Sequence, residues 1–380
     1  MAASLKILCA GHLIRHPVGG HTWHHLQYLI GLRRLGHQVV FFEHFGWPNS
    51  CYDAGRDEMT ADPRFGIDYL RAVFDKSGYD GRWCYLAEDG SEHGMTRAQL
   101  SAFCRACDLF LNLSNINWIP ELEQCRRRAM VDTDPVFTQA GGHGAGGAFS
   151  NYHLLFTYGE NVHKESCTMP TAGRRWHPTR QPVVLDLWPI EPPPPPDASL
   201  TTVINWAAYG DVKYQDRTFG QKDREFEKFT DLPRRAGEAM EMAMNGPKEV
   251  RDRFAAGGWC VASPAEISHD PWTYQNYLRR SRGEFCVAKH GYVSTRCGWF
   301  SDRSAAYLAS GRPVVLQDTG FSDFLPCGRG LLTFRSPQEA LAGIRALRDD
   351  YPVHCRAARA IAEEFFDSEK VLSRLVLESL

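Results

Sequence analysis

The chain has 380 residues, of which 43% are hydrophobic and 23% charged, and its 43 basic residues nearly balance its 45 acidic residues. This length allows two domains that each bury a core. A net charge of -2 provides no long-range field for nucleic acid or anionic lipid, and no run approaches the roughly 18 apolar residues that span a bilayer. Because its twelve cysteines show no regular spacing, we expect a protein of the reducing cytoplasm, without nucleic acid or a membrane span.

Apolar runs alternate with amphipathic segments along the first half of the chain. Residues 5–10 predict a strand, residues 22–35 a helix with apolar side chains at helical spacing, and residues 38–42 a second strand. Further strands are expected at 108–113, 129–132 and 154–158. This alternation predicts a mostly parallel sheet with helices on both faces.

A proline-rich segment, WPIEPPPPPDAS at residues 188–199, interrupts the alternation and marks a domain boundary. Beyond it, strands are expected at 201–206, 258–262, 284–289 and 313–317, and helices at 231–244, 272–281, 301–309, 337–348 and 354–366. The expected domains are 1–190 and 200–366, both doubly wound α/β units, with a helical tail at 367–380 that can return to the first domain. A ligand is expected in the cleft between them.

The stretch KHGYVSTRCGWFSDR runs from the end of a predicted strand into a helix that begins at Ser301 or Asp302. The N–H groups and the dipole at such a helix start favour an anion. Lys289, Arg296 and Arg303 add positive charge nearby. The stretch therefore predicts a phosphate or diphosphate site, although surface ion pairs and a glycine turn would explain the same residues.

A second ligand contact is expected at Asp318, Thr319 and Gly320, which follow the predicted strand at 313–317. The Asp318 carboxylate is suited to accept hydrogen bonds from sugar hydroxyls, and the next two residues present backbone N–H groups. Asp-Thr-Gly is also a common structural turn.

Several motifs together resemble the GT-B fold nucleotide-sugar glycosyltransferases, of the glycosyltransferase group 1 type. ASGRPVVLQDTG, at 309–320, is similar to the family's ACGxPVVxxDxGG, and GRGLL, at 328–332, to its dGxxGlL. Residues 17–43, which begin PVGGHTWHHL, resemble the family's opening loop and first helix. The resemblance implies two Rossmann-like domains facing each other across a cleft, with the acceptor side in 1–190 and the donor in 200–366.

The resemblance also implies an activity, transfer of a hexose from a nucleotide-diphosphate sugar to a small-molecule or glycan acceptor, without a metal or a further cofactor. Lys213 and Lys222, on a loop expected to face the donor, are further phosphate contacts or solvated side chains. The diphosphate is expected to contact charged side chains and helix-start N–H groups at Lys289, Arg296, Ser301 and Asp302.

The second half departs from the family in one respect. Retaining members carry a glutamate in the helix before the AxG motif, where this chain has Ala306 or Tyr307. Asp302 and Glu284 are candidate substitutes. The departure leaves two alternatives open: a nucleotide-sugar 2-epimerase, which needs carboxylates around the donor sugar, and a nucleotide-sugar-binding protein without catalysis.

The opening loop supports two interpretations of His21. In inverting members a histidine in GHxxP acts as the general base, and Gly20-His21 stands at the same distance from the end of the helix. In retaining members the glycines of PxGG approach the donor phosphates, and Gly19 and Gly20 match them. A neutral imidazole suits a base near pH 7, so either His21 is the base or the glycines contact phosphate.

His21 and His25 are spaced i, i+4 but lack the glutamate of H-E-x-x-H, so no metal site is predicted. The glycine-rich segment at 140–150 predicts either a lid or a connector. Three polar side chains on predicted loops are expected on the acceptor side, namely His12, Asp134 and His143.

Overall fold

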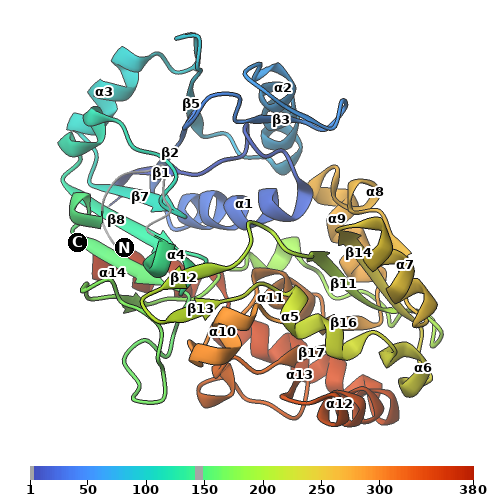
Figure 1. Ribbon diagram of the computed structural model, residues 1–380. Coiled ribbons are helices and arrows are strands. Elements are labelled where there is room, and N and C mark those ends of the chain that lie inside the picture. The colour runs from blue at the N-terminus through green and yellow to red at the C-terminus, as the bar shows by residue number, and fades with distance from the viewer. Residues whose placement is uncertain (1–3, 142–148) are drawn as a thin grey trace.

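The computed structural model describes residues 4–141 and 149–380 and contains two large β-sheets, one in each half of the chain. In Figure 1 the first sheet lies in the upper lobe, coloured blue to green, and the second in the lower lobe, coloured yellow to red. Helix α1 (Gly19–Arg34) lies between the two lobes.

The first sheet has the strand order β10-β9-β8-β7-β1-β2-β5-β6, and only β6 runs antiparallel to its neighbour. Its strands are β1 (Lys6–Ala10), β2 (Gln38–His44), β5 (Arg82–Leu86), β6 (Glu92–Gly94), β7 (Leu109–Leu113), β8 (Arg127–Asp132), β9 (Leu154–Thr157) and β10 (His177–Pro178). The same half contains the hairpin β3 (Cys51–Asp53) and β4 (Glu58–Thr60) and the helices α2 (Arg64–Ser77), α3 (Arg97–Arg105) and α4 (Phe137–Gly141).

The second sheet is parallel throughout, in the order β15-β14-β11-β16-β17-β18. Its strands are β11 (Leu200–Asn205), β14 (Met240–Asn245), β15 (Cys260–Ala262), β16 (Gly283–Cys286), β17 (Val314–Gln317) and β18 (Leu331–Phe334), and a small hairpin joins β12 (Val212–Tyr214) to β13 (Arg217–Phe219). The helices are α5 (Asp223–Phe226), α6 (Leu232–Ala236), α7 (Lys248–Ala256), α8 (Pro264–Ser268), α9 (Pro271–Arg280), α10 (His290–Thr295), α11 (Asp302–Ala309), α12 (Pro337–Asp349), α13 (Tyr351–Phe365) and α14 (Ser368–Ser379).

Both sheets have the Rossmann strand order. When the six central strands of each domain are numbered along the chain, each sheet reads 3-2-1-4-5-6. The order reverses between β1 and β7 in the first domain and between β11 and β16 in the second. The predicted fold class, two Rossmann-like doubly wound domains, is therefore confirmed, and ligands of such sheets bind outside the carboxyl ends of these strands.

Residues 231–244 do not form the single helix that the sequence predicts. Helix α6 ends at Ala236 because Gly237 adopts a left-handed conformation, with φ of 65°. The segment then becomes β14, which is hydrogen-bonded to β11 on one side and to β15 on the other. The stretch between β16 and α11 also contains a short helix, α10, that was expected to be loop.

The chain passes between the domains twice, at neighbouring points. Val183 forms an isolated parallel bridge with Asp367, and the N–H of Ser368 donates to the Val183 carbonyl at 2.9 Å. The proline-rich linker is fastened to the second domain, where Arg312 donates to the carbonyl of Pro192 at 2.9 Å.

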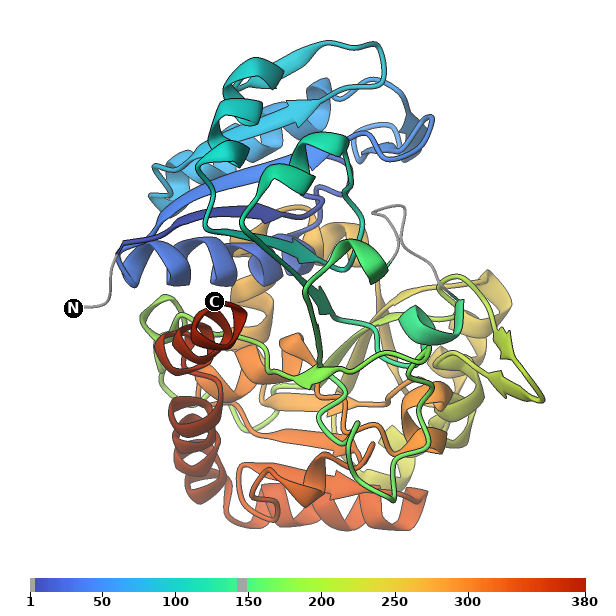
Figure 2. The ribbon, with the colours of Figure 1, turned by 90° about the vertical axis from the view of Figure 1, so that its left-hand side faces the viewer.

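Helix α14 packs on the first domain. It lies against α1, where a Cβ on Gly31 would lie 2.5 Å from Leu372, and Arg127 of β8 donates to the Ser379 carbonyl at 2.9 Å. Figure 2 shows this last helix, in dark red, beside the blue helix α1.

An apolar core continues across the domain boundary. Trp23 of α1 and Trp188 of the linker pack with Tyr274 and Phe300 of the second domain, and the Trp23 indole donates to the Pro271 carbonyl at 2.5 Å. Among the helices of the described residues, none has the length and apolar character needed to cross a bilayer.

Candidate functional site

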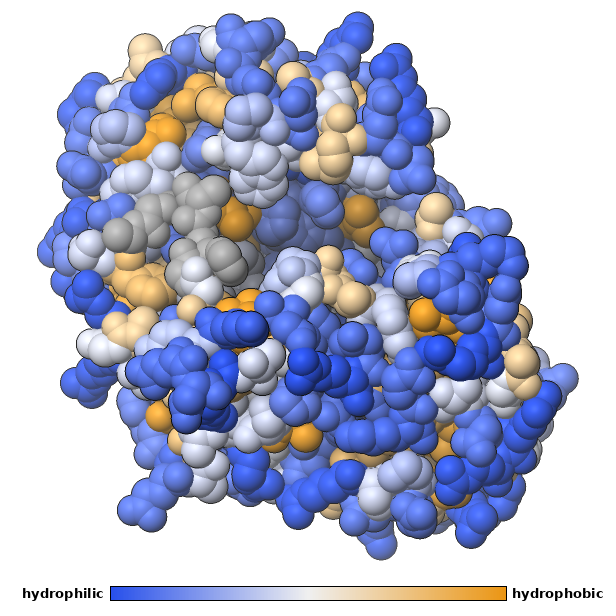
Figure 3. Space-filling view, in the orientation of Figure 1, coloured by the Kyte–Doolittle hydropathy of each residue, from blue (hydrophilic) through white to orange (hydrophobic). Residues whose placement is uncertain are grey.

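The molecule is hollowed between its two lobes on the face seen in Figure 3. The starts of α1 and α11 lie close together between the lobes. Gly20 and His24 of the first domain and Asp302 and Arg303 of the second domain line one narrow cavity there, of about 20 Å³. The helix start predicted to bind an anion therefore faces the opening loop of the other domain.

The two glycines at the start of α1 allow α9 to approach closely. A Cβ on Gly19 would lie 2.3 Å from the carbonyl oxygen of Asp270, and one on Gly20 would lie 2.9 Å from the ring of Tyr274. The Gly20 N–H donates to the Ser268 hydroxyl at 3.2 Å. Contact between the domains accounts for both glycines, and this arrangement gives no support to the phosphate contact expected there.

Helix α11 begins where the sequence predicts, with Ser301 as its N-cap residue and Asp302 in the first turn. Ser301 is buried and its hydroxyl makes no capping hydrogen bond. Asp302 is exposed to solvent, yet desolvation by the surrounding protein raises the pKa of its carboxyl. Asp302 is therefore surrounded by protein but still accessible to solvent, as expected for a side chain on the wall of a cleft, where a ligand can reach it.

Glu284, the other candidate substitute for the missing glutamate, is not accessible. It is fully buried on β16, and its two oxygens accept hydrogen bonds from Arg303 Nε and from the Ser304 hydroxyl, both at 2.5 Å. Arg303 also donates to the Val203 carbonyl at 2.7 Å. Glu284 therefore holds Arg303 in place, and Asp302 alone of the two carboxylates is open to a ligand.

Lys222, between β13 and α5, has no hydrogen bond or ion pair from its ammonium group to any part of the chain that the structure describes. Desolvation lowers its pKa to about 8; the neighbouring cations Arg303 and Lys289 act in the same direction, whereas Cys286 and Glu284 raise it. An anionic ligand next to the ammonium would stabilise its charge. The sequence indicated Lys222 only as one of two loop lysines, and its distinct position became visible from the structure.

Lys289 joins the two domains through Asp134. The Lys289 ammonium lies 2.9 and 2.8 Å from the two carboxylate oxygens, and the hydroxyls of Tyr209 and Tyr292 donate to the same carboxylate. The ammonium also lies 4.7 Å from the centre of the Phe137 ring. Asp134 was expected on the acceptor side, and this stays a prediction; in the structure its carboxylate contacts the second domain.

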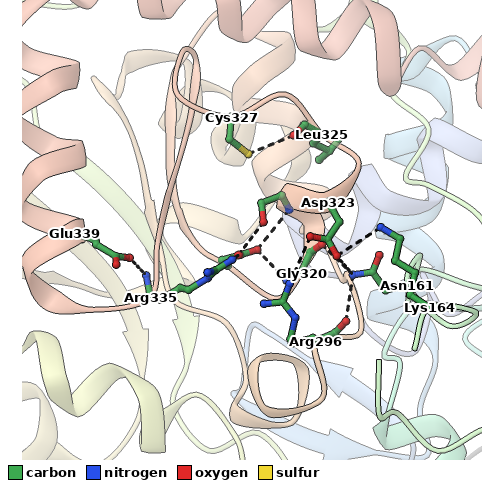
Figure 4. Close-up of polar contacts among 11 residues, drawn as sticks. Asn161, Lys164, Arg296, Gly320, Asp323, Leu325, Cys327, Arg335 and Glu339 are labelled. Atoms are coloured by element: carbon green, nitrogen blue, oxygen red, sulfur yellow. Dashed lines mark hydrogen bonds and ion pairs between the residues drawn. The ribbon is translucent and has the colours of Figure 1, made fainter. Parts of the chain in front are cut away.

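Arg296 contributes to a second interdomain contact, away from Lys289 and its partners. It ends α10 with a φ of 51°, and its guanidinium lies 3.4 Å from the Asp323 carboxylate. From the first domain, Asn161 donates to the carbonyls of Arg296 at 3.2 Å and Gly320 at 2.9 Å, and Figure 4 shows its amide between these groups. These partners engage Arg296 within the protein, and its expected diphosphate contact stays a prediction.

The turn at Asp318 is likewise occupied by contacts within the chain. The Asp318 carboxylate accepts hydrogen bonds from the Gly320 N–H and the Ser322 hydroxyl, both at 2.8 Å, and from Arg335 at 2.7 Å. The Thr319 hydroxyl is buried and donates to a backbone carbonyl. These contacts give the turn a structural role, and its predicted sugar contacts stay a prediction.

Glu43 fixes the loop that carries His12. Its carboxylate accepts hydrogen bonds from the consecutive backbone N–H groups of residues 13–15 at 2.7–2.8 Å and from Arg15 Nε at 3.2 Å. Both members of this ion pair are buried. The conformation of the loop is therefore set by a buried charge pair.

His21 is partly exposed in the first turn of α1, and its Nε2 donates to the His12 carbonyl at 3.0 Å. Burial, with the nearby His25 and His16, lowers its pKa well below the usual value. At pH 7 the ring is therefore neutral, and Nδ1 carries the lone pair. His143 and the glycine-rich segment around it lie outside the described residues.

No sequence pattern indicated a role in the site for His24, Tyr209, Tyr292 or Asn161. His24 lines the interdomain cavity with Asp302, and its Nε2 is buried without a partner among the described residues. The one sequence pattern that could have indicated His24 is its i, i+3 spacing from His21, which places the two side chains next to each other on α1.

Comparisons with known proteins place the fold. A scan of protein-family models finds no match, and a search of the curated proteins finds none either. Among solved structures, an α-glucosyltransferase in complex with UDP and a 13-mer DNA is similar with a TM-score of 0.58 and 10% identity, covering 98% of this chain and 99% of that one.

Two further structures match over nearly the whole chain. AviGT4, a glycosyltransferase involved in avilamycin A biosynthesis, has a TM-score of 0.54 and 12% identity, covering 99% of this chain and 97% of its own. Anabaena HepE in complex with UDP and glucose has a TM-score of 0.53 and 11% identity, covering 99% and 100%. The similarity establishes the GT-B fold of two facing Rossmann-like domains.

Proposed function

We propose that this protein is a glycosyltransferase of the hexosyltransferase type, which moves a sugar from a nucleotide-diphosphate donor to a small-molecule or glycan acceptor. The observation that carries the proposal is Lys222, a desolvated cation beside the start of α11 that forms no ion pair within the described residues, in a fold shared with glycosyltransferases solved in complex with UDP. The second domain binds the donor.

Lys222, Lys289 and the first N–H groups of α11 hold the diphosphate. When the bond from the anomeric carbon to the phosphate oxygen breaks, negative charge grows on the leaving diphosphate, and fixed cations and N–H groups stabilise it. Lys289 takes part when phosphate oxygens compete with Asp134 for its ammonium. These groups supply the positive charge that a divalent ion supplies elsewhere, so the diphosphate needs neither a metal nor a cofactor.

Asp302 is the carboxylate that contacts the donor sugar. It is open to the cleft, while Glu284 and Asp318 are occupied by arginine and hydroxyl partners. Its oxygens accept hydrogen bonds from sugar hydroxyls, which orients the anomeric carbon toward the first domain. A 2-epimerase, which needs several free carboxylates around the sugar, is disfavoured by the same observation.

His21 is the candidate general base. Its Nδ1 lone pair accepts the proton of the attacking acceptor hydroxyl as the new glycosidic bond forms. Replacement His21→Ala is expected to lower turnover at least about a hundredfold and to leave donor affinity nearly unchanged. His269→Ala, at an exposed histidine, is the matched control. A loss confined to donor affinity would contradict the base role.

The donor is identified by thermal shift with UDP-, dTDP- and GDP-sugars, followed by release of nucleoside diphosphate with and without acceptors. Lys222→Ala is expected to weaken donor binding at least about tenfold, roughly the 1.4 kcal/mol of one charge-assisted contact, and Lys213→Ala to leave it unchanged. Deuterium at sugar C2 without an acceptor would instead indicate an epimerase. Binding without turnover for any acceptor would indicate a binding protein.

A further inference from the structure

Three histidines of the first domain converge on one point. His12 lies in the loop after β1, and His21 and His25 lie one turn apart on α1. One ring nitrogen of each lies within 4.8 Å of those of the other two. The ring centres are 3.9 Å apart for His12 and His21, 4.5 Å for His21 and His25, and 5.4 Å for His12 and His25.

Hydrogen bonds to backbone carbonyls orient two of these rings through one nitrogen of each. His21 Nε2 donates to the His12 carbonyl, and His25 Nδ1 donates to the His21 carbonyl, both at 3.0 Å. A carbonyl only accepts, so each of these nitrogens carries the proton and the other one of each ring carries a lone pair. Donation of the second ring N–H to a backbone carbonyl is the usual support of a metal-ligating histidine.

His12 supplies the third nitrogen. Its Nδ1 is buried and has no hydrogen-bond partner among the described residues. His25 Nε2 accepts a long hydrogen bond from the His12 backbone N–H, with 3.3 Å between the two nitrogens, and a metal ion would displace this bond.

We propose that His12, His21 and His25 bind one divalent transition-metal ion, with Zn²⁺ as the best fit. Imidazole nitrogen is a preferred ligand of zinc, and three protein ligands with one open position are typical of zinc sites that bind water. His12 and His21 are partly exposed, so a water molecule can complete the coordination. Zinc–nitrogen bonds of about 2.0–2.1 Å require the three rings to draw together by side-chain rotation.

The fourth histidine of the loop stands at the rim of this three-histidine site. The ring of His16 is exposed, and its centre lies 6.1 Å from that of His12 and 6.2 Å from that of His21. At this distance it is not a ligand in the present arrangement. The one carboxylate that fixes the loop, Glu43, is already occupied by Arg15 and by backbone N–H groups.

Metal binding and the base role of His21 exclude each other. An imidazole nitrogen that donates its lone pair to a metal ion cannot accept a proton from a hydroxyl. The metal site stands on its own geometry and does not depend on the proposed transferase activity. If His21 is the base, zinc that fills the site inhibits transfer, and a chelator restores it.

The test measures metal binding to the full-length protein without donor or acceptor. After chelator treatment, the protein is dialysed against micromolar Zn²⁺, and bound zinc is counted per chain. Co²⁺ is then used as a probe, because tetrahedral coordination gives it intense visible absorption. We expect one zinc per chain and a tetrahedral Co²⁺ spectrum for the wild-type protein.

Variants identify the ligands. His12→Ala and His21→Ala are expected to weaken zinc binding at least about a hundredfold, more than loss of a supporting contact would, while His16→Ala and His269→Ala keep one zinc per chain. Circular dichroism checks that the variants are folded. A wild-type protein that binds no zinc at micromolar concentration overturns the proposal, as does a zinc content that His12→Ala and His21→Ala leave unchanged.

Discussion

Lys222 is expected to make donor binding depend on pH in the alkaline range. Its pKa is lowered to about 8, so its charge is present below that pH and is lost above it. With that pKa, the charged fraction of Lys222 falls from roughly 0.9 at pH 7 to roughly 0.1 at pH 9. The affinity for a diphosphate whose binding needs this charge therefore falls by about tenfold. The terminal phosphate of a nucleoside diphosphate loses its last proton near pH 6 and adds little to this slope.

Isothermal titration calorimetry with UDP between pH 7 and pH 9 measures the effect. Lys222→Arg keeps its charge throughout, because a guanidinium does not lose its proton in this range, and is expected to give a nearly flat profile. Lys213→Ala, at an exposed lysine of the neighbouring hairpin, should retain the wild-type slope. A wild-type profile as flat as that of Lys222→Arg, or an unchanged slope in Lys222→Arg, would refute the reasoning.

Three further predictions concern contacts between and within the domains. Gly19→Ala is expected to cost about 1–3 kcal/mol of unfolding free energy, because the new Cβ would lie 2.3 Å from the Asp270 carbonyl oxygen. The control Gly343→Ala, inside α12, should be neutral or stabilising, because its Cβ would have its nearest contact at 3.4 Å. Equal shifts of the two variants in thermal unfolding would argue against the close approach at Gly19. Glu43→Gln leaves the buried Arg15 charge without its partner and should lower the free energy of unfolding in urea by about 3–5 kcal/mol. The control Glu378→Gln, in a more exposed ion pair, should lower it by under about 1 kcal/mol. Asp134→Asn frees Lys289 and should tighten UDP binding about 1.4- to fivefold by calorimetry, from the roughly 0.2–1 kcal/mol of a partly exposed pair. Weaker binding would show that Asp134 supports the donor.

Most of the fold could be predicted because parallel strands buried on both faces read as continuous apolar runs. The loop that contains α10 was one exception, and Met240–Asn245 was another. Its methionines, alanine and glutamate favour a helix, and the segment becomes a strand because β11 and β15 lie on either side of it. Strand pairing with segments distant in the sequence overrode the local helix preference, and a local sequence pattern does not reveal such pairing.

The candidate site was less predictable than the fold. The start of α11 was readable because a cap residue follows a strand and a loop. The ion-pair partners of individual charged residues could not be predicted. Asp134 and Lys289, for example, are 155 residues apart, and they meet only because of the way the two domains pack together. Asp318 shows the same limit, since its turn was recognised and its occupation by Arg335 was not.

The two neighbouring crossings at Val183 and Asp367 make the second domain an insertion within the first. Exchange of the second domain by recombination with a protein of the same fold therefore needs two junctions, one in the linker at 188–199 and one near Asp367. A chimaera with a single junction would join α14 of one parent to α1 of the other, where Leu372 fits against a glycine at position 31 with no room for a Cβ. The last helix must therefore be inherited together with the first.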